Sequence, residues 1–199
     1  MINFALKIER SIIQSNTPIM DSAIELTKKI CEMCFDIVLR CGPFMKETIY
    51  QDLLIHELNL IDITTTRELV FNYCFDDSNG KPITICNNQF LRTDIEMPCH
   101  EAILELKSTT AATKEEQLWQ LRNYLENRDD RKWGIVINFI HKFGARTSPK
   151  VQCDLLYKSD VFYKTSNDIN KIPIRKYHTW RIESASYPDK EDIMLNTTE

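Results

Sequence analysis

The sequence predicts a mixed α/β (α+β) fold in which helices flank one central mixed sheet. Two amphipathic helical segments fill the first third of the chain. Segments rich in β-branched and aromatic residues fill the middle, and a further helix and a buried strand follow. The length of 199 residues, with 43% hydrophobic and 27% charged residues, suits one core with additions. We therefore expect an N-terminal extension over residues 1–20, one domain over 21–160 and a C-terminal extension over 161–199 that packs on the core or trails from it.

The helical segments come first along the chain. Residues 3–14 are expected to form a short helix. Thr17-Pro18 fits an N-cap followed by proline at the first helical position, and apolar residues at helical spacing continue to Gly42-Pro43, where Gly42 suits a left-handed cap. A second helix is expected from about Met45 to Leu58, with its apolar residues on one face.

The apolar spacing then changes to that of strands. The first strand is expected at Glu68–Phe75, and Asn79-Gly80 after it is a strong signal for a hairpin turn. Further strands are expected at 83–86, 90–96, 102–107, 134–140 and 151–157. A helix with Thr113 as its N-cap runs to about Asn127, between the strands at 102–107 and 134–140. The pattern beyond the last strand predicts no clear element.

The composition excludes several classes of protein. Four glycines and seven prolines exclude a collagen-like or low-complexity chain. No apolar run approaches the roughly 18 to 20 residues of a membrane span, and the first ten residues lack the pattern of a signal peptide. We therefore expect no membrane partner and an intracellular, reducing compartment, cytoplasm or nucleus, in which the seven scattered cysteines are thiols. The richness in Ile, Asn and Lys fits an AT-rich genome, viral or bacterial.

The net charge of −4 offers no general attraction for nucleic acid, although a local patch can supply one. One candidate is a stretch of cations interleaved with aromatic rings near the C-terminus. Its basic members are Lys171, Arg175, Lys176 and Arg181. Such a stretch suits a phosphate backbone and stacked bases, but a surface strand with buried aromatic residues explains it equally well. A weaker patch contains Arg122, Arg128, Arg131 and Lys132.

The clearest chemical signal is a pair of segments, Arg92–Glu96 and Ile103–Lys107, that predicts an antiparallel hairpin. In this hairpin Asp94 falls opposite Glu105, and directly opposed side chains lie about 4.5 to 5.5 Å apart at Cβ. Two facing carboxylates repel each other unless a positive group lies between them. A divalent cation is the obvious candidate, and hard oxygen ligands favour Mg²⁺ or Mn²⁺.

Lys107 lies two residues beyond Glu105 and therefore projects from the same face of the strand. An ammonium beside a metal ion can orient an attacking water and stabilise charge on a phosphate. The main-chain carbonyl of Leu106 can supply a further metal ligand. Glu-x-Lys on a strand is more often an exposed ion pair, but Ile103-Leu104 and Leu106 give this strand the character of the core. Asp, then Glu-x-Lys, on paired strands is thus an arrangement that can cleave phosphodiesters.

Two pairs on predicted helices accompany these residues. Glu47 and Tyr50 share a face at three-residue spacing, and Gln120 and Tyr124 share a face at four-residue spacing. Each pair alone is a weak signal, because a tyrosine at helical spacing is more often part of the core or its boundary. The order of these elements, with the carboxylate hairpin between them, is far more specific.

With this order, the sequence resembles the GxxExxY family, a branch of the PD-(D/E)XK nuclease superfamily with RecB-like motifs. The resemblance spans roughly residues 24 to 140. The segments that carry it are Cys41–Tyr50, Leu53, Glu57-Leu58, Arg92–Asp94, Ile103–Ser108, Gln120–Leu125 and Gly134–Phe139. Phe44 stands where members of the family have a glycine, and the chain beyond about residue 145 has no clear counterpart.

The resemblance implies a restriction-endonuclease-like core and an active site on it. The implied site residues are Glu47, Asp94, Glu105, Lys107, Gln120 and Tyr124. Asp94, Glu105 and the Leu106 carbonyl would hold one or two Mg²⁺ or Mn²⁺ ions, with Glu47 acting through a water molecule. Lys107 would position the attacking water, and the helix with Gln120 and Tyr124 would line the site.

Other features carry less weight. Cys31-x-x-Cys34, with Cys41 nearby, can suggest an iron–sulfur or metal ligand set, but a cluster needs four ligands and the remaining cysteines show no matching spacing. We expect reduced core thiols. His100, expected in the hairpin loop beside the site, can assist proton transfer, but a loop histidine is usually only polar. The other three histidines, among them His141, show no ligand spacing.

The leading hypothesis is a metal-dependent nuclease that hydrolyses phosphodiester bonds in DNA processing, repair or recombination. We expect DNA to be favoured over RNA, and a monomer or homodimer. The alternative is a catalytically silent module that binds nucleic acid or protein on the same fold, which the acidic net charge and Phe44 favour. An enzyme for RNA, or for branched or damaged DNA, cannot be separated from these by sequence.

Overall fold

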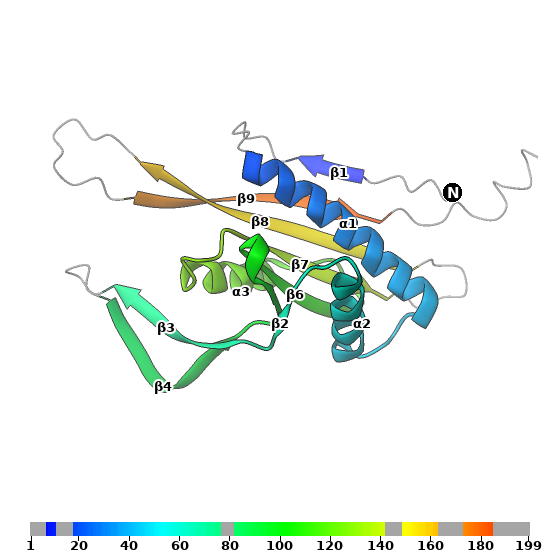
Figure 1. The fold of residues 1–199 in the computed structure, drawn as a ribbon, viewed down its shortest axis with the longest axis horizontal. Coiled ribbons are helices and arrows are strands. Elements are labelled where there is room, and N and C mark those ends of the chain that lie inside the picture. The colour runs from blue at the N-terminus through cyan, green and yellow to red at the C-terminus, as the bar shows by residue number, and fades with distance from the viewer. Residues whose placement is uncertain (1–6, 11–17, 77–81, 142–148, 163–172, 185–199) are drawn as a thin grey trace, which may run out of the picture.

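The computed structural model describes residues 7–10, 18–76, 82–141, 149–162 and 173–184. A seven-stranded sheet forms the centre, in the order β1-β9-β8-β7-β6-β5-β2, and β3 and β4 form a separate two-stranded ribbon. The strands are β1 (Lys7–Arg10), β2 (Thr66–Arg67), β3 (Val70–Asp76), β4 (Pro82–Arg92), β5 (Ile95–Met97), β6 (Ala102–Thr109), β7 (Trp133–Ile140), β8 (Lys150–Phe162) and β9 (Pro173–Glu183). Figure 1 shows the ribbon extending away from the body that the sheet and helices form.

Helices cover both faces of the sheet. Helices α1 (Pro18–Cys41) and α2 (Glu47–Leu60) pack on one face, and α3 (Glu115–Glu126) packs on the other. A one-turn 3₁₀ helix, η1 (Pro98–His100), joins β5 to β6. This arrangement confirms the predicted fold class of a mixed sheet flanked by helices and is consistent with a restriction-endonuclease-like core. None of the helices in the described ranges has both the length and the apolar character needed to cross a membrane.

The side chains of β6 alternate between two apolar cores. Leu104 and Leu106 belong to the larger core beneath α1 and α2, whereas Ile103 belongs to the smaller core beneath α3. Because alternate residues of a strand share a face, Glu105 and Lys107 project on the side of Ile103, toward α3. The two charged residues therefore lie on the face that α3 covers.

The connection from β6 through α3 to β7 brings that helix close to the sheet. β6 and β7 run parallel, and the other described neighbours in the sheet are antiparallel. A parallel pair needs a long crossover, which α3 supplies. A Cβ atom at Gly134 would lie 2.6 Å from Cδ1 of Leu121 and 2.8 Å from the carbonyl oxygen of Ile103. Glycine at this position of β7 thus sets how closely α3 approaches the sheet.

The predicted helices are found with small shifts at their ends. Helix α1 ends at Cys41, and Gly42 follows with a left-handed φ of 84°. Helix α2 begins and ends two residues later than predicted. Helix α3 begins after Lys114 rather than after Thr113, because Gln117 Oε1 accepts a hydrogen bond from the Lys114 N–H (2.8 Å). Thr17 and the Asn79-Gly80 turn lie outside the described residues.

The prediction of a helix over residues 3–14 is wrong for its described part. Residues 7–10 form β1, which pairs with β9 in the register Lys7↔Glu183 to Arg10↔Trp180. A short isolated helix gains few hydrogen bonds for its nucleation cost, whereas the edge of β9 offers a backbone ladder. Strand β9 was not predicted as a clear element, although a surface strand was one explanation of its basic stretch.

The prediction that 83–86 and 90–96 form two separate strands is also wrong. β4 is continuous from Pro82 to Arg92, and the chain breaks its pairing at Thr93-Asp94 before β5 begins. The reason is a change of partner, since β4 pairs with β3 in the ribbon and β5 pairs with β6 and β2 in the sheet. Asp94 lies at this junction.

Candidate active site

Asp94 and Glu105 face each other at the open end of the β5–β6 hairpin. The register pairs Ile95 with Leu104. One step further, Asp94 lies opposite Glu105, as the sequence predicts. The residues between them and the loop are buried, so both carboxylates lie at the edge of the core rather than on an exposed ladder.

Three hydrogen bonds fix Asp94, one of them a bond of 3.0 Å from the main-chain N–H of Glu68 to its main-chain carbonyl. Its main-chain carbonyl accepts a bond of 2.6 Å from Nε2 of Gln51 in α2. Its carboxylate Oδ2 accepts a bond of 2.7 Å from the main-chain N–H of Leu106. Burial raises the pKa of Asp94, and the Leu106 N–H and the Lys107 ammonium oppose that rise. The backbone and the carboxylate of Asp94 are thus held by different elements.

Glu105 is a buried carboxylate with only part of its hydrogen-bonding capacity used. Its side chain is 2% exposed, and Oε1 accepts a bond of 2.5 Å from Nζ of Lys107. Oε2 is buried and finds no hydrogen-bond donor among the described residues. Burial and then repulsion from Asp94 raise the pKa of Glu105 to about 7, against the opposing effect of Lys107. An unpaired buried acceptor of this kind is costly unless a positive group completes it.

Lys107 carries the positive charge of the site. Burial lowers its pKa, but Glu105, Glu47 and Asp94 outweigh that effect, and the pKa is raised overall. The side chain therefore remains an ammonium at neutral pH. It can donate hydrogen bonds to a water molecule or a phosphate oxygen, but it cannot act as a general base there.

Glu47 is the first residue of α2, and it joins this cluster from a different element than the β5–β6 hairpin. It is half-buried, and burial raises its pKa. Lys107 opposes that rise, Asp94 adds to it, and a hydrogen bond from the main-chain N–H of Ser108 opposes it. The charges of Glu47, Asp94, Glu105 and Lys107 thus act on one another, so the structure brings these four predicted residues together.

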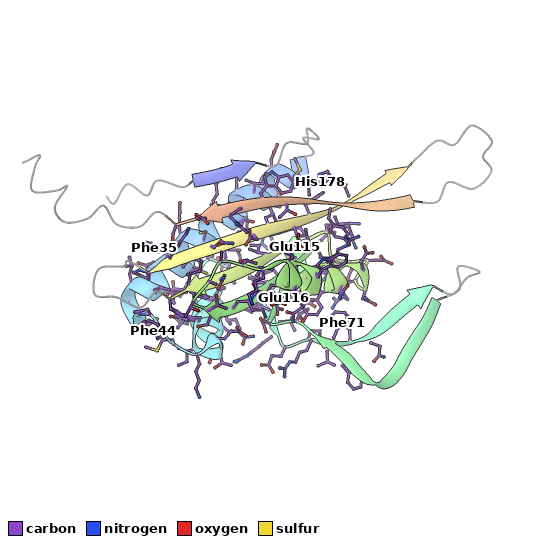
Figure 2. The ribbon with its side chains drawn as sticks, turned by 180° about the vertical axis from the view of Figure 1, so that it is seen from behind. Phe35, Phe44, Phe71, Glu115, Glu116 and His178 are labelled. Atoms are coloured by element: carbon purple, nitrogen blue, oxygen red, sulfur yellow. The ribbon has the colours of Figure 1, made fainter. Side chains whose placement is uncertain are left out.

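The turn before Glu47 is held by Tyr50. The Tyr50 hydroxyl donates to the carbonyl of Gly42 (3.1 Å) and accepts from the N–H of Met45 (3.4 Å). Its fully buried ring stacks on Phe139 with a centroid distance of 4.0 Å. Phe44, labelled in Figure 2, has a left-handed φ of 67° inside this turn. A glycine adopts that conformation without strain, whereas a residue with a Cβ atom disfavours it.

Gln120 and Tyr124 form a hydrogen-bonded pair on α3. Gln120 Nε2 donates to the Tyr124 hydroxyl (2.7 Å), and the ring of Tyr124 packs in the smaller core with Ile103. The pair therefore lies over the sheet face that carries Glu105 and Lys107. The preceding residue, Trp119, is 55% exposed on another side of α3, with the guanidinium of Arg122 4.9 Å from its ring centroid.

The donors present fit a divalent cation bound by few protein ligands. Among the described residues, no group of three or more His, Cys, Asp or Glu side chains gathers so that it could hold a metal ion by itself. Mg²⁺ does not need such a cage, because it keeps several waters and uses one or two carboxylates with substrate phosphates. Asp94 and Glu105 supply two carboxylates, and Oε2 of Glu105, which has no partner in the described part of the chain, is an oxygen available to such an ion.

No described contact places the predicted basic stretch near the candidate active site. Lys171 lies outside the described residues, and the side chains of Arg175 and Lys176 in β9 are not described. Arg181 donates through Nε to Oδ1 of buried Asp154 (2.7 Å). In the weaker patch, Arg128 and Arg131 both form ion pairs with the buried Glu96 and so stabilise the interior of the protein.

His100 is not beside the carboxylates, and that expectation is wrong. η1 closes the hairpin at the end opposite to Asp94 and Glu105, where His100 lines a cleft with residues of α1. Cys31, Cys34 and Cys153 are buried free thiols, and burial raises the pKa of Cys34 and of Cys153. Cys41 is half-buried and also free. These described cysteines behave as the predicted core and boundary thiols.

Four residues around the site were not assigned by the sequence. They are Gln51, Ser108, Asn138 and His141. Gln51 anchors Asp94. Asn138 is buried, accepts from the Thr109 hydroxyl (2.9 Å) and donates to the Ala111 carbonyl (2.9 Å), and so ties down the chain between β6 and α3. Asn138 belongs to a segment that the resemblance marks, which is the only sequence signal for it. His141 contacts residues that are distant from it in the sequence, and its role depends on these contacts.

Comparison with known proteins gives a family match. Residues 24–150 match the family model described as the PD-(D/E)XK nuclease superfamily. This range includes all six predicted site residues on α2, the β5–β6 hairpin and α3. No curated protein matches the chain significantly.

Proposed function

Because the chain belongs to the PD-(D/E)XK nuclease superfamily, we propose that it hydrolyses phosphodiester bonds of DNA with the help of Mg²⁺ or Mn²⁺. The observation that carries the proposal is Oε2 of Glu105, which is buried opposite Asp94 and has no hydrogen-bond partner among the described residues. A stable core does not need this arrangement, whereas a cation-dependent site does.

The residues take the following roles in this proposal. Asp94, Glu105 and the Leu106 carbonyl hold the cation, which, when bound, polarises the phosphate and makes water more acidic. Lys107, an ammonium at neutral pH, donates to the attacking water or to a phosphate oxygen and so stabilises developing negative charge. Glu47 reaches the cation through water.

Gln120 and Tyr124 act as one unit in this proposal. Their mutual hydrogen bond fixes the amide of Gln120, which leaves its remaining polar atoms to contact substrate. Because Tyr124 is 3% exposed and packs in the core, it orients Gln120 rather than contacting DNA through its ring.

We also propose that the chain is a GxxExxY-type member of the superfamily. The left-handed φ of Phe44 supports this, because the third residue before Glu47 has the backbone conformation that a glycine favours. The contacts of Tyr50 with Gly42 and Met45 give the tyrosine of this pattern a role, which is to close the turn that presents Glu47.

A cleavage assay tests the function. Purified protein is incubated with supercoiled plasmid and with labelled single- and double-stranded DNA and RNA, in Mg²⁺, Mn²⁺ or EDTA. We expect metal-dependent cleavage of DNA that falls at least about 100-fold in Glu105→Gln. Glu116→Gln, at an exposed position of α3, is the matched control and keeps wild-type activity.

The outcomes separate the two hypotheses. Cleavage in EDTA, or wild-type cleavage by Glu105→Gln, would overturn the proposed mechanism. Salt-dependent binding of nucleic acid without cleavage in any metal would favour the silent binding module. Sedimentation of the same preparation decides between monomer and homodimer.

A further inference from the structure

His141 connects three elements next to the site. It directly follows β7, is 5% exposed, and donates through its main-chain N–H to the Thr109 carbonyl (2.7 Å). Its Nδ1 lies 3.2 Å from the main-chain nitrogen of Phe44, and its Nε2 lies 2.7 Å from Oγ of Ser108. The ring also lies 5.0 Å from that of Phe44, between centroids.

One protonation state satisfies all of these contacts. The N–H of Phe44 can only donate, so Nδ1 must accept and carry no proton. Nε2 then carries the proton and donates to Ser108 Oγ, and the Ser108 hydroxyl donates to the Met45 carbonyl (3.0 Å). Burial lowers the pKa of His141, which favours this neutral form. An imidazolium would direct Nδ1–H at the N–H of Phe44.

The same contacts lead to Glu47 by two routes. Ser108 donates its main-chain N–H to the Glu47 carboxylate while its hydroxyl holds Met45, two residues before Glu47. Phe44, held by Nδ1, is in the left-handed conformation that residues other than glycine disfavour, so the turn needs an external partner to stay in place. Tyr50 holds one side of this turn, and His141 with Ser108 holds the other.

We propose that His141, through Phe44 and Ser108, is a positioning residue that orients Glu47 for the cleavage reaction. The proposal rests on the proposed function for its kinetic consequence, but the arrangement of hydrogen bonds can be measured without it. His141 touches neither Asp94 nor Glu105 in the described contacts, so its effect on the reaction passes through the turn and through Ser108.

Three substitutions separate the two contacts. His141→Asn places an amide oxygen near the position of Nδ1 and can keep the Phe44 bond. His141→Gln places an amide NH₂ near the position of Nε2 and can keep the Ser108 bond. His141→Leu removes both. The matched control is His178→Leu in β9, because His178 is also buried and also bonds a serine, Ser159, through Nε2 (2.9 Å).

The kinetic test compares kcat and KM for a DNA substrate among folded variants. We expect His141→Leu to lower kcat about 10- to 100-fold with KM little changed, and His141→Asn or His141→Gln to recover part of the loss. His178→Leu should keep the wild-type kcat although it too is destabilised. Equal kcat values in His141→Leu and His178→Leu would overturn the proposal.

An NMR measurement tests the same proposal without cleavage. Backbone amide ¹H shifts are recorded for Phe44 and Ser108 in metal-free protein. We expect His141→Leu to move both signals upfield, His141→Asn to keep the Phe44 signal, and His178→Leu to move neither. A Ser108 amide signal that stays in place in His141→Leu would show that Glu47 is held independently of His141. If wild-type protein fails to cleave but the shifts behave as expected, the proposed function fails and the positioning of Glu47 stands.

Discussion

Two buried glutamates on the same hairpin differ in how completely they are paired. Glu96 in β5 has no exposed surface. Its Oε1 accepts from Arg128 (2.8 Å) and from the Thr93 hydroxyl (3.2 Å), and its Oε2 accepts from Arg131 (2.8 Å). Glu105 in β6 is equally buried but has one ammonium on Oε1 and no donor on Oε2 among the described residues.

The difference separates a structural charge from the one for which we propose a function. Glu96 joins β5 to the chain between α3 and β7, and every polar atom of its carboxylate is used. Glu105 faces a second carboxylate, which raises its pKa further. Burial alone therefore does not mark a functional acid. The incomplete pairing does, because it leaves a position at which a ligand lowers the free energy.

The largest effect on stability is expected at Glu96. Glu96→Gln keeps the shape of the side chain but removes the buried charge between two largely buried guanidiniums, which then pair, among the described residues, only with the exposed carboxylate of Asp130. The free energy of unfolding should therefore fall by about 3 kcal/mol. Guanidinium titration measures this as a lower midpoint at an unchanged slope. A loss below about 1 kcal/mol would mean that the pairing of Glu96 contributes no more than a surface bridge.

Glu105→Gln should act in the opposite direction in metal-free protein. The carboxyl has a pKa of about 7 when folded against an ordinary value of 4.5, so the unfolded chain releases the proton first as the pH rises. The wild type therefore loses stability between about pH 4.5 and 7, and the loss is complete above that range. At pH 8 in EDTA the variant should be about 1–3 kcal/mol more stable, with no difference at pH 4.5. Parallel pH profiles of the two proteins would contradict this.

Cation binding should raise the stability of the wild type by a smaller amount. At ten times its Kd, Mg²⁺ or Mn²⁺ bound only to the folded state adds about 1.4 kcal/mol. Thermal unfolding at pH 8, with the ion or with EDTA, measures the shift. Glu105→Gln should lose most of the shift and Glu96→Gln should keep it. An equal shift in both variants would place the ion elsewhere.

The smallest expected effect concerns Phe44. Its left-handed φ costs roughly 1 kcal/mol for any residue with a Cβ atom, so Phe44→Gly should be about 1 kcal/mol more stable than Phe44→Ala. Both variants lose the contact of the ring with His141, which isolates the backbone term. Equal midpoints in urea would show that the turn relaxes when the ring is removed.

The sequence predicts the parts of the fold and of the site that depend on residues close together in the chain. The pairing of Asp94 with Glu105 follows from a short hairpin, whose register is set by its loop and by alternation of apolar residues. The end of α1 at Cys41 follows from Gly42 and Pro43, which come directly after it. The positions of Gln120 and Tyr124 follow from helical spacing.

The remaining parts depend on contacts that local patterns do not contain. The pairing of residues 7–10 with β9 joins segments about 170 residues apart, and nothing in a four-residue segment specifies such a partner. His141 meets Phe44 only because β7 ends beside the turn before α2. The ion pairs of Arg128 and Arg131 with Glu96 likewise require the folded hairpin. These two arginines look like part of a basic surface patch in the sequence, but in the fold they belong to a network of ion pairs in the interior.

The exposure of Trp119 gives the protein an optical signal of its own. The chain has three tryptophans, of which Trp133 and Trp180 are buried at 3% and 7% exposure and Trp119 is 55% exposed. An indole that solvent and solutes can reach is quenched by iodide or by a stacked base, whereas the two buried indoles are shielded. Because Trp119 adjoins Gln120 in α3, its emission should report substrate arriving at this helix in real time, without a label and in EDTA, where no bond is cut.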